Sequence, residues 1–145
     1  MREIKFRGFN RKNNEWIYGF YLQNRGAHFV CPDEFADGKS WDDYEIDTDT
    51  LGQFTGLTDK NGVKIFENDI VCKRDLTFGL KFDGVVVYNS EIGCFRIHSE
   101  NNGVTMRMGF EESDVYNDGQ CTVPVKYDYE VIDNIYDNKN FLKHG

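Results

Sequence analysis

The chain has 145 residues, 15% of them aromatic, and a formal net charge of −8. A chain of this length forms one compact domain or two small lobes, and the aromatic content favours strands. The acidic balance argues against a general nucleic-acid binder, since phosphate backbones are not attracted to it from a distance. No signal-peptide pattern opens the chain, and no apolar run approaches the roughly 18 residues of a membrane span. We therefore expect no membrane partner.

The first 50 residues predict a β-hairpin, a third strand and a short helix. "REIKFRGFN" alternates apolar and polar residues, and "NEWIYGFYLQN" follows after a polar loop at Asn10–Asn14. "AHFVC" reads as the third strand. Residues 31–38 predict a short helix, because Pro32 suits a first helical position and Gly38 suits a helix end. An acidic loop follows, with a short strand expected at 44–46.

The stretch "FTGLTDKNGVKIFENDIV" predicts two turns and the corner of a sheet. Thr55-Gly56 and Asn61-Gly62 are expected to be turns, because Gly and Asn tolerate a positive φ. Val63 and Ile65 are expected in the core. Residues 67–69 are expected to form the polar corner that opens the next strand.

The second half of the chain predicts a three-stranded meander with strands at about 84–88, 94–99 and 104–108. Residues 111–120 read as a polar connection, and "YEVIDNIYDN" as a last strand. The sum is a mainly β fold, a small antiparallel barrel or sandwich with one or two short helices. We expect a single compact domain over residues 1–145, with a weak boundary between two β lobes near 66–72.

Two short acidic motifs resemble parts of a calcium loop, but both fail in register. Such a loop ends on a carboxylate at position 12. Counting from Asp47 places Thr58 there, and counting from Asp59 places Ile70 there. The sequence therefore predicts turns with solvated carboxylates and no metal site.

Catalytic patterns are equally incomplete. "PDEFADGK" holds Asp33, Asp37 and Lys39 in one loop rather than on adjacent strands, as a metal-dependent nuclease would need. Cys31 and His28 are three residues apart and would face opposite sides of a strand. The four cysteines contain no C-x-x-C spacing. We expect buried thiols in a reduced compartment, no catalytic residue and no cofactor, with a small metal-dependent hydrolase as the least favoured class.

The N-terminal hairpin interleaves cations with aromatic residues, as a single-stranded nucleic-acid platform does. The candidate contacts are Lys5, Arg7, Arg11, Lys12, Trp16 and Tyr18. The alternative, which we favour, is a plain hairpin with aromatics inward and bases outward. Residues 1–30 carry a net +4 and residues 31–50 a net −7. These two segments are expected to attract each other within the fold or between subunits.

Three blocks of the sequence resemble the YopX protein family. They are "IKFRGFNRKNNEWIYG", "DTDTLGQFTGLTDKNGVKIFENDIV" and "YEVIDNIYDNKNFL", which begin, centre and end the chain. The family more often has Gly where this chain has Asn68 and Asp133. The residues that match the family signature, to which we assign a structural role, are Thr55, Gly56, Asp59, Gly62, Ile65, Glu67, Asp69, Ile70 and Asn134.

The resemblance implies a largely β fold with an SH3-like barrel element, made by a phage or prophage in the bacterial cytoplasm. It implies no activity, so no catalytic residue is carried over. We expect a non-enzymatic β module that acts by protein–protein contact, either as a homo-oligomer or with a host or phage partner. The alternative is an accessory protein that binds single-stranded nucleic acid through the N-terminal hairpin.

Overall fold

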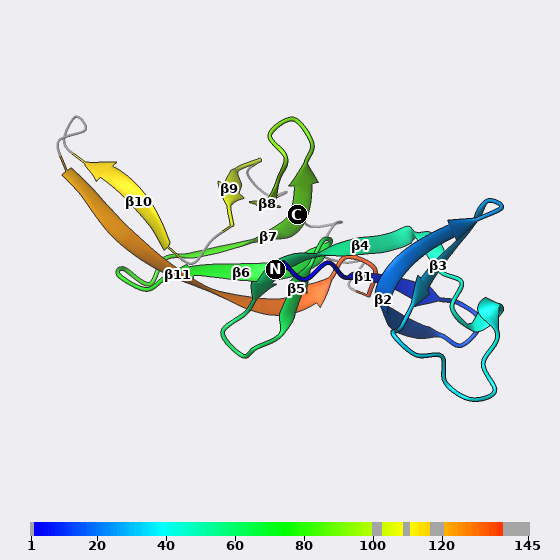
Figure 1. Ribbon diagram of the computed structural model, residues 1–145. Helices are drawn as coiled ribbons and strands as arrows, with labels where there is room; N and C mark the ends of the chain where they lie inside the picture. The colour runs from blue at the N-terminus through cyan, green and yellow to red at the C-terminus, as the bar shows by residue number, and fades with distance from the viewer. Residues whose placement is uncertain (1, 100–102, 109–110, 117–120, 138–145) are drawn as a thin grey trace. The chain divides into compact units, whose positions relative to one another are not determined.

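The computed structural model describes residues 2–99, 103–108, 111–116 and 121–137 (Figure 1). The chain divides into two compact units, Met1–Gly56 and Leu57–Gly145. This division falls ahead of the boundary near 66–72 that the sequence predicts. The predicted mainly β fold is confirmed, because antiparallel strands make up both units and the described helical structure is a single short turn.

Unit 1 is built on an antiparallel sheet in which the N-terminal hairpin is central. Its elements are β1 (Phe6–Asn10), β2 (Glu15–Asn24), β3 (Ala27–Cys31), the 3₁₀ turn η1 (Trp41–Asp43) and β4 (Asp47–Thr58), which runs on past Gly56. The sheet order is β3-β2-β1-β4-β5, and its last strand, β5 (Lys64–Phe66), falls in unit 2. The predicted hairpin and third strand are confirmed. The buried core of unit 1 consists of Ile17, Phe29, Val30, Cys31, Tyr44 and Ile46.

Unit 2 is built on a second antiparallel sheet with the order β10-β11-β6-β7-β8-β9. Its strands are β6 (Asp69–Asp75), β7 (Lys81–Asn89), β8 (Cys94–His98), β9 (Thr105–Arg107), β10 (Glu111–Tyr116) and β11 (Cys121–Asn134). The predicted meander is confirmed as β7, β8 and β9. The fully buried core residues of unit 2 are Ile65, Val71, Val86, Ile97 and Tyr129.

Two local predictions for unit 1 are wrong. Residues 31–38 form no helix, and the one helical turn begins at Trp41 instead. Residues 47–58, expected to be an acidic loop followed by a Thr-Gly turn, form the long strand β4. The cause is pairing with β1, in which Phe6 lies opposite Gln53. Gly56 still uses its freedom, since its φ is +91° inside the strand.

Two predictions for unit 2 are also wrong. Residues 111–116 pair with β11 as a strand, where a polar connection was expected. Val63, expected in the core, is 48% exposed because it closes the turn ahead of β5, whereas Ile65 is fully buried as predicted. The described strands form open sheets rather than a closed barrel. The SH3-like element stays a prediction. Nowhere in the described residues is there a helix with the length and apolar character to cross a membrane.

Candidate functional site

Arg7, Phe9, Trp16 and Tyr18 of the N-terminal hairpin share one face of β1 and β2. Arg7 lies opposite Tyr18, and Phe9 lies opposite Trp16. Arg7 is only 5% exposed, and its guanidinium lies 4.9 Å from the centroid of a Trp16 ring. Phe9 packs on Trp16 with centroids 5.4 Å apart. Arg7 is therefore buried against Trp16 and is not placed to contact a phosphate backbone.

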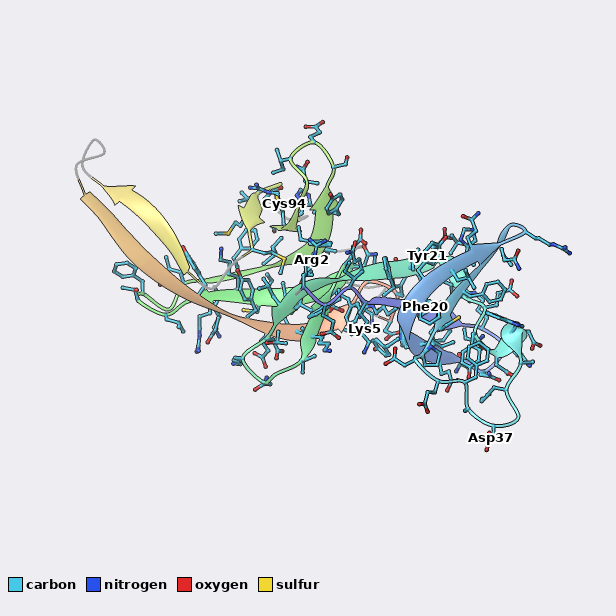
Figure 2. The ribbon with its side chains drawn as sticks, in the orientation of Figure 1. Arg2, Lys5, Phe20, Tyr21, Asp37 and Cys94 are labelled. Atoms are coloured by element: carbon cyan, nitrogen blue, oxygen red, sulfur yellow. The ribbon has the colours of Figure 1, made fainter. Side chains whose placement is uncertain are left out.

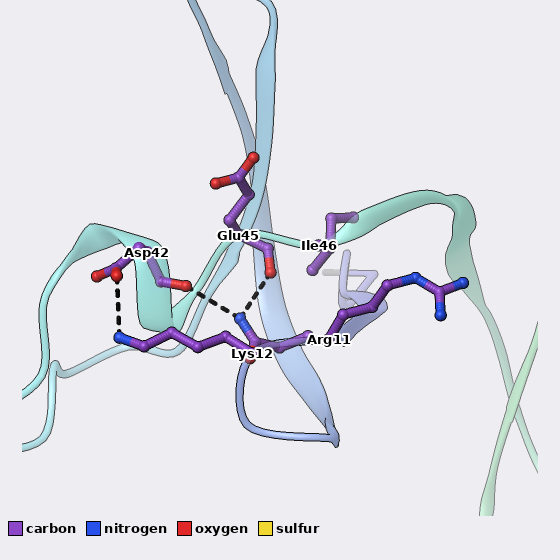
Figure 3. A pocket seen from close by; sticks show the side chains of 6 residues that line it. Arg11, Lys12, Asp42, Glu45 and Ile46 are labelled. Atoms are coloured by element: carbon purple, nitrogen blue, oxygen red, sulfur yellow. Dashed lines mark hydrogen bonds and ion pairs between the residues drawn. The ribbon is translucent and has the colours of Figure 1, made fainter.

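The two cations of the hairpin loop are held by acidic residues of unit 1, and Figure 3 shows the contact of Lys12 with Asp42. Arg11 Nε donates to Asp47 Oδ2 at 2.8 Å. Lys12 Nζ lies 2.9 Å from Asp42 Oδ2 and 3.0 Å from Asp43 Oδ1. Of the two expected attractions between the basic and acidic segments, the one within the fold is therefore present.

These contacts change the proton affinity of the groups that make them. Hydrogen bonds to Asp42 and Asp43 raise the pKa of Lys12. Hydrogen bonds from Asn13, from the backbone N–H of Ser40 and from Lys12 hold the pKa of Asp43 well below its usual range. All of these groups keep their charges at neutral pH. The contribution to stability is small, because exposed ion pairs are well screened by water.

Asn10, at the end of β1, also binds the acidic segment that holds the hairpin loop. Its side chain is 1% exposed. Its Nδ2 donates to the carbonyl oxygens of Asp42 at 3.1 Å and Glu45 at 2.7 Å, and its Oδ1 accepts the N–H of Asn13 at 2.7 Å. An open pocket of about 300 Å³ lies over this position, lined by Asn10, Arg11, Lys12, Asp42, Glu45 and Ile46. Asn10 and Lys12 already bind Asp42 and the Glu45 carbonyl there, so the pocket lies where the acidic segment packs on the hairpin loop.

The candidate nucleic-acid contacts are thus brought together only in part. Arg7, Trp16 and Tyr18 share a face, while Arg11 and Lys12 belong to the loop and its acidic partners. Tyr18 is 44% exposed and Lys5 is partly buried. Figure 2 shows Lys5 and Phe20 on the N-terminal segment and β2. Of the four candidate cations, Arg7, Arg11 and Lys12 therefore already contact other groups of unit 1.

An aromatic group in residues 29–44 was not predicted from the sequence. The ring centroid of Phe35 lies 5.1 Å from that of Trp41, at an interplanar angle of 79°, and 4.3 Å from that of Tyr44. Phe29 packs on the edge of Trp41 at 5.5 Å. Phe35 and Trp41 are 42% and 53% exposed, whereas Phe29 and Tyr44 are buried. We call these residues the aromatic corner. The signal was the row of aromatics in "FADGKSWDDY", which follows neither strand nor helix spacing.

In unit 2 the family-signature residue Asp59 is a buried structural carboxylate. Its side chain accepts hydrogen bonds from three backbone N–H groups, those of Asn61 at 2.8 Å, Val63 at 2.9 Å and Val131 at 3.0 Å. Burial pushes the pKa of Asp59 up, but the three donors outweigh it, so the pKa is lowered. Asp59 therefore ties the turn ahead of β5 to β11 as an anion.

Two other signature residues, Asp69 and Asn134, lie in the corner at the start of β6. Asp69 accepts the N–H of Phe66 at 2.8 Å. Asn134 lies opposite Asp69 in the β11–β6 pairing. Asn68 adopts a φ of +72°, and its Nδ2 donates to the hydroxyl of Tyr136 at 3.0 Å. The central and C-terminal family blocks therefore meet in one structural corner.

Asn68 allows a direct test of this corner. We expect Asn68→Ala to lower the free energy of unfolding by about 2 kcal/mol, since alanine is strained at positive φ and cannot reach Tyr136. Asn68→Gly should be close to neutral, because relief of the strain offsets the lost hydrogen bond. Urea unfolding followed by circular dichroism measures both. Equal stability of the alanine and glycine variants would show that the left-handed backbone is not what Asn68 supplies.

The turn between β6 and β7 presents apolar side chains to solvent. Leu76, Phe78 and Leu80 are 51%, 70% and 70% exposed. The turn is ordered by Asp75, which is buried and whose carboxylate accepts the N–H of Thr77 at 2.7 Å. The backbone N–H of Asp75 donates to the carbonyl of Leu80 at 2.8 Å. We call residues 76–80 the apolar turn.

Chemistry-bearing groups are dispersed over the described residues. Three or more His, Cys, Asp or Glu side chains in a metal-holding arrangement are not found there. Cys31, Cys72 and Cys94 are free thiols. Cys31 is fully buried as predicted, whereas Cys72 and Cys94, also expected to be buried, are only partly buried. Burial, followed by the nearby Asp83, raises the pKa of Cys72 to about 11, so this thiol stays protonated at neutral pH.

Comparison with known proteins identifies a similar solved structure and a family. The fold is similar to the crystal structure of protein EF1440 from Enterococcus faecalis, with a TM-score of 0.53 and 26% sequence identity over 98% of this chain and 99% of that chain. A search of curated proteins finds no match. The model described as YopX protein matches residues 5–143. The chain therefore belongs to the YopX protein family.

Proposed function

We propose that the protein is a non-enzymatic β module that acts by protein–protein contact, made by a phage or prophage and working in the bacterial cytoplasm. Neither the family nor the name of the structural relative brings an activity with it. The support lies in the surface. The cations of the hairpin loop bind acidic residues of unit 1, and the signature residues have structural roles. Large apolar side chains, by contrast, are exposed to solvent.

The apolar turn carries the proposal. Turn tips are normally polar, and a run of exposed apolar residues costs solubility unless it has a function. Leu76, Phe78 and Leu80 together expose apolar surface on the order of 350 Å². A patch of this size on a small protein is often a binding site. Because backbone hydrogen bonds already order the turn, binding to a partner would cost little conformational entropy.

The size of the patch indicates the kind of contact. Two apolar turns packed tip to tip would bury roughly 700 Å², below the ~1,200 Å² of a stable interface. The turn is better suited to insert as an anchor into a pocket on a partner. Arg74 and Lys81 lie opposite each other at its base, and Asp128 binds Arg74 at 2.6 Å. Lys81 is exposed, so a carboxylate at the rim of that pocket would complement it.

The proposal is tested with a serine-substituted turn, Leu76→Ser/Phe78→Ser/Leu80→Ser, and with Ile92→Ser as a matched control. Ile92 is 57% exposed on the β7–β8 turn, at the other end of β7. We expect affinity capture from bacterial lysate to recover a discrete partner with wild type and the control, and about tenfold less with the substituted turn. Sedimentation velocity over a concentration series tests self-association. Equal capture by all three proteins, with all three monomeric, would overturn the proposal.

Nucleic-acid binding is the alternative, and the structure favours it less because Arg7 is buried and Arg11 and Lys12 are paired. Binding of single-stranded nucleic acid that falls steeply with salt, and that Lys12→Ala weakens, would support the alternative. Binding that is absent at low salt would remove it.

A further inference from the structure

The aromatic corner is a second exposed surface, on unit 1 and separate from the apolar turn. Its two outer rings, Phe35 and Trp41, stand nearly perpendicular and are about half exposed. Their inner neighbour Tyr44 is buried, and its hydroxyl accepts the N–H of Ala36 at 3.0 Å. The exposed rings therefore rest on a fixed base.

The chain that carries the corner is held by its own hydrogen bonds. The N–H of Lys39 donates to the carbonyl of Ala36 at 3.2 Å. The N–H of Ser40 donates to Asp43 Oδ2 at 2.9 Å, and Asp43 in turn binds Lys12 of the hairpin loop. The partial exposure of the rings is thus a property of an ordered segment.

The exposed charges next to Phe35 in the chain are mainly negative. Asp33, Glu34 and Asp37 flank Phe35 in the chain and are exposed, with Lys39 as the one cation of residues 33–39. Figure 2 shows Asp37 at the outer end of this segment, directed away from the sheet. The cations of the hairpin loop bind three other acids, Asp42, Asp43 and Asp47. These cations therefore do not neutralise the negative charge of Asp33, Glu34 and Asp37.

We propose that the aromatic corner binds a cationic segment of a partner protein. Ring faces of tryptophan and phenylalanine attract Arg and Lys side chains, and flanking carboxylates pair with further cations. This inference rests on the proposed function in that the occupant is a protein, but it uses a different surface. The N-terminal hairpin of a second copy offers few cations for this site, because Arg7 is buried and Arg11 and Lys12 are engaged. Nucleic acid would be repelled by the acids.

The test uses the intrinsic fluorescence of Trp41. The chain has two tryptophans, so Trp16→Phe leaves Trp41 as the reporter. An Arg-Gly repeat peptide of about 12 residues is titrated, with a Glu-Gly repeat of the same length as the control. We expect a saturable change with the cationic peptide alone, weakened about tenfold between about 50 mM and about 500 mM salt.

Two variants in the Trp16→Phe background separate the aromatic and charge contributions. The first, Phe35→Ala, should weaken peptide binding about fivefold by removing one ring face. The second, Asp33→Asn/Glu34→Gln/Asp37→Asn, leaves the rings in place and should also weaken it about fivefold and flatten the salt dependence. No saturable change, or unchanged binding by both variants, would overturn the inference. The serine-substituted turn should bind the peptide normally, so loss of partner capture by that variant alone reports on the proposed function.

Discussion

Gly19→Ala is expected to abolish the stable fold of unit 1. A Cβ at position 19 would lie 1.9 Å from the carbonyl oxygen of Cys31 and 2.9 Å from the backbone nitrogen of Pro32. Both are backbone atoms, and Cys31 is paired to Phe20 in the β2–β3 ladder. The clash can be relieved only by moving β3, which we expect to cost about 4 kcal/mol or more.

The measurement is urea unfolding followed by tryptophan fluorescence, because Trp16 and Trp41 both lie in unit 1. Gly26→Ala is the matched control. An alanine at position 26 would have a strained backbone, because the φ there is +81°. However, no atom lies within 4 Å of its Cβ position, so it would meet no steric clash. It should cost only about 1 kcal/mol. If Gly19→Ala were no more destabilising than Gly26→Ala, the close approach of β3 to β2 would be contradicted.

Asp59→Ala is expected to have the largest effect in unit 2, about 4 kcal/mol. The substitution leaves the N–H groups of Asn61, Val63 and Val131 without their charged acceptor, and each hydrogen bond to a charged group is worth about 1.5–3 kcal/mol. Asp59→Asn should cost about half as much. It keeps one oxygen for the turn but turns an N–H₂ group toward the N–H of Val131. Hydrogen exchange of the Val131 amide gives a local readout.

The effect of Asp59 should depend on pH. Its pKa is lowered in the folded protein, so its stabilising contribution is complete above the unfolded pKa of about 3.9 and is lost as pH falls through the folded value. The stability difference between wild type and Asp59→Asn should therefore shrink below pH ~4. A difference that is constant from neutral to acid pH would show that the charge of Asp59 does not matter.

Much of the fold follows from local pattern. Strict alternation and a polar loop are sufficient to predict the hairpin of β1 and β2, and Asn61-Gly62 is sufficient for the turn ahead of β5. β4 and β10 were missed for one reason. Residues 47–49 and 111–114 are rich in acids, which disfavour strands locally, and pairing with β1 and β11 overrides that preference.

The candidate site was less predictable. The opposite charges of residues 1–30 and 31–50 indicated an attraction, but the choice between pairing within the fold and between subunits required the contacts of Arg11 and Lys12. The aromatic corner and the apolar turn are surfaces, and exposure is a tertiary property. "LTFGL" could equally be buried as exposed. Only the folded β6–β7 turn shows that its side chains stand in solvent.

The central claim is that the apolar turn is a contact surface, and site-specific photocrosslinking tests it most directly. A photoreactive phenylalanine analogue is placed at position 78, with a matched protein labelled at position 92. The account predicts that position 78 crosslinks one discrete partner in bacterial cells and that position 92 does not. Absence of a crosslinked product at position 78, or the same products at both positions, would contradict it.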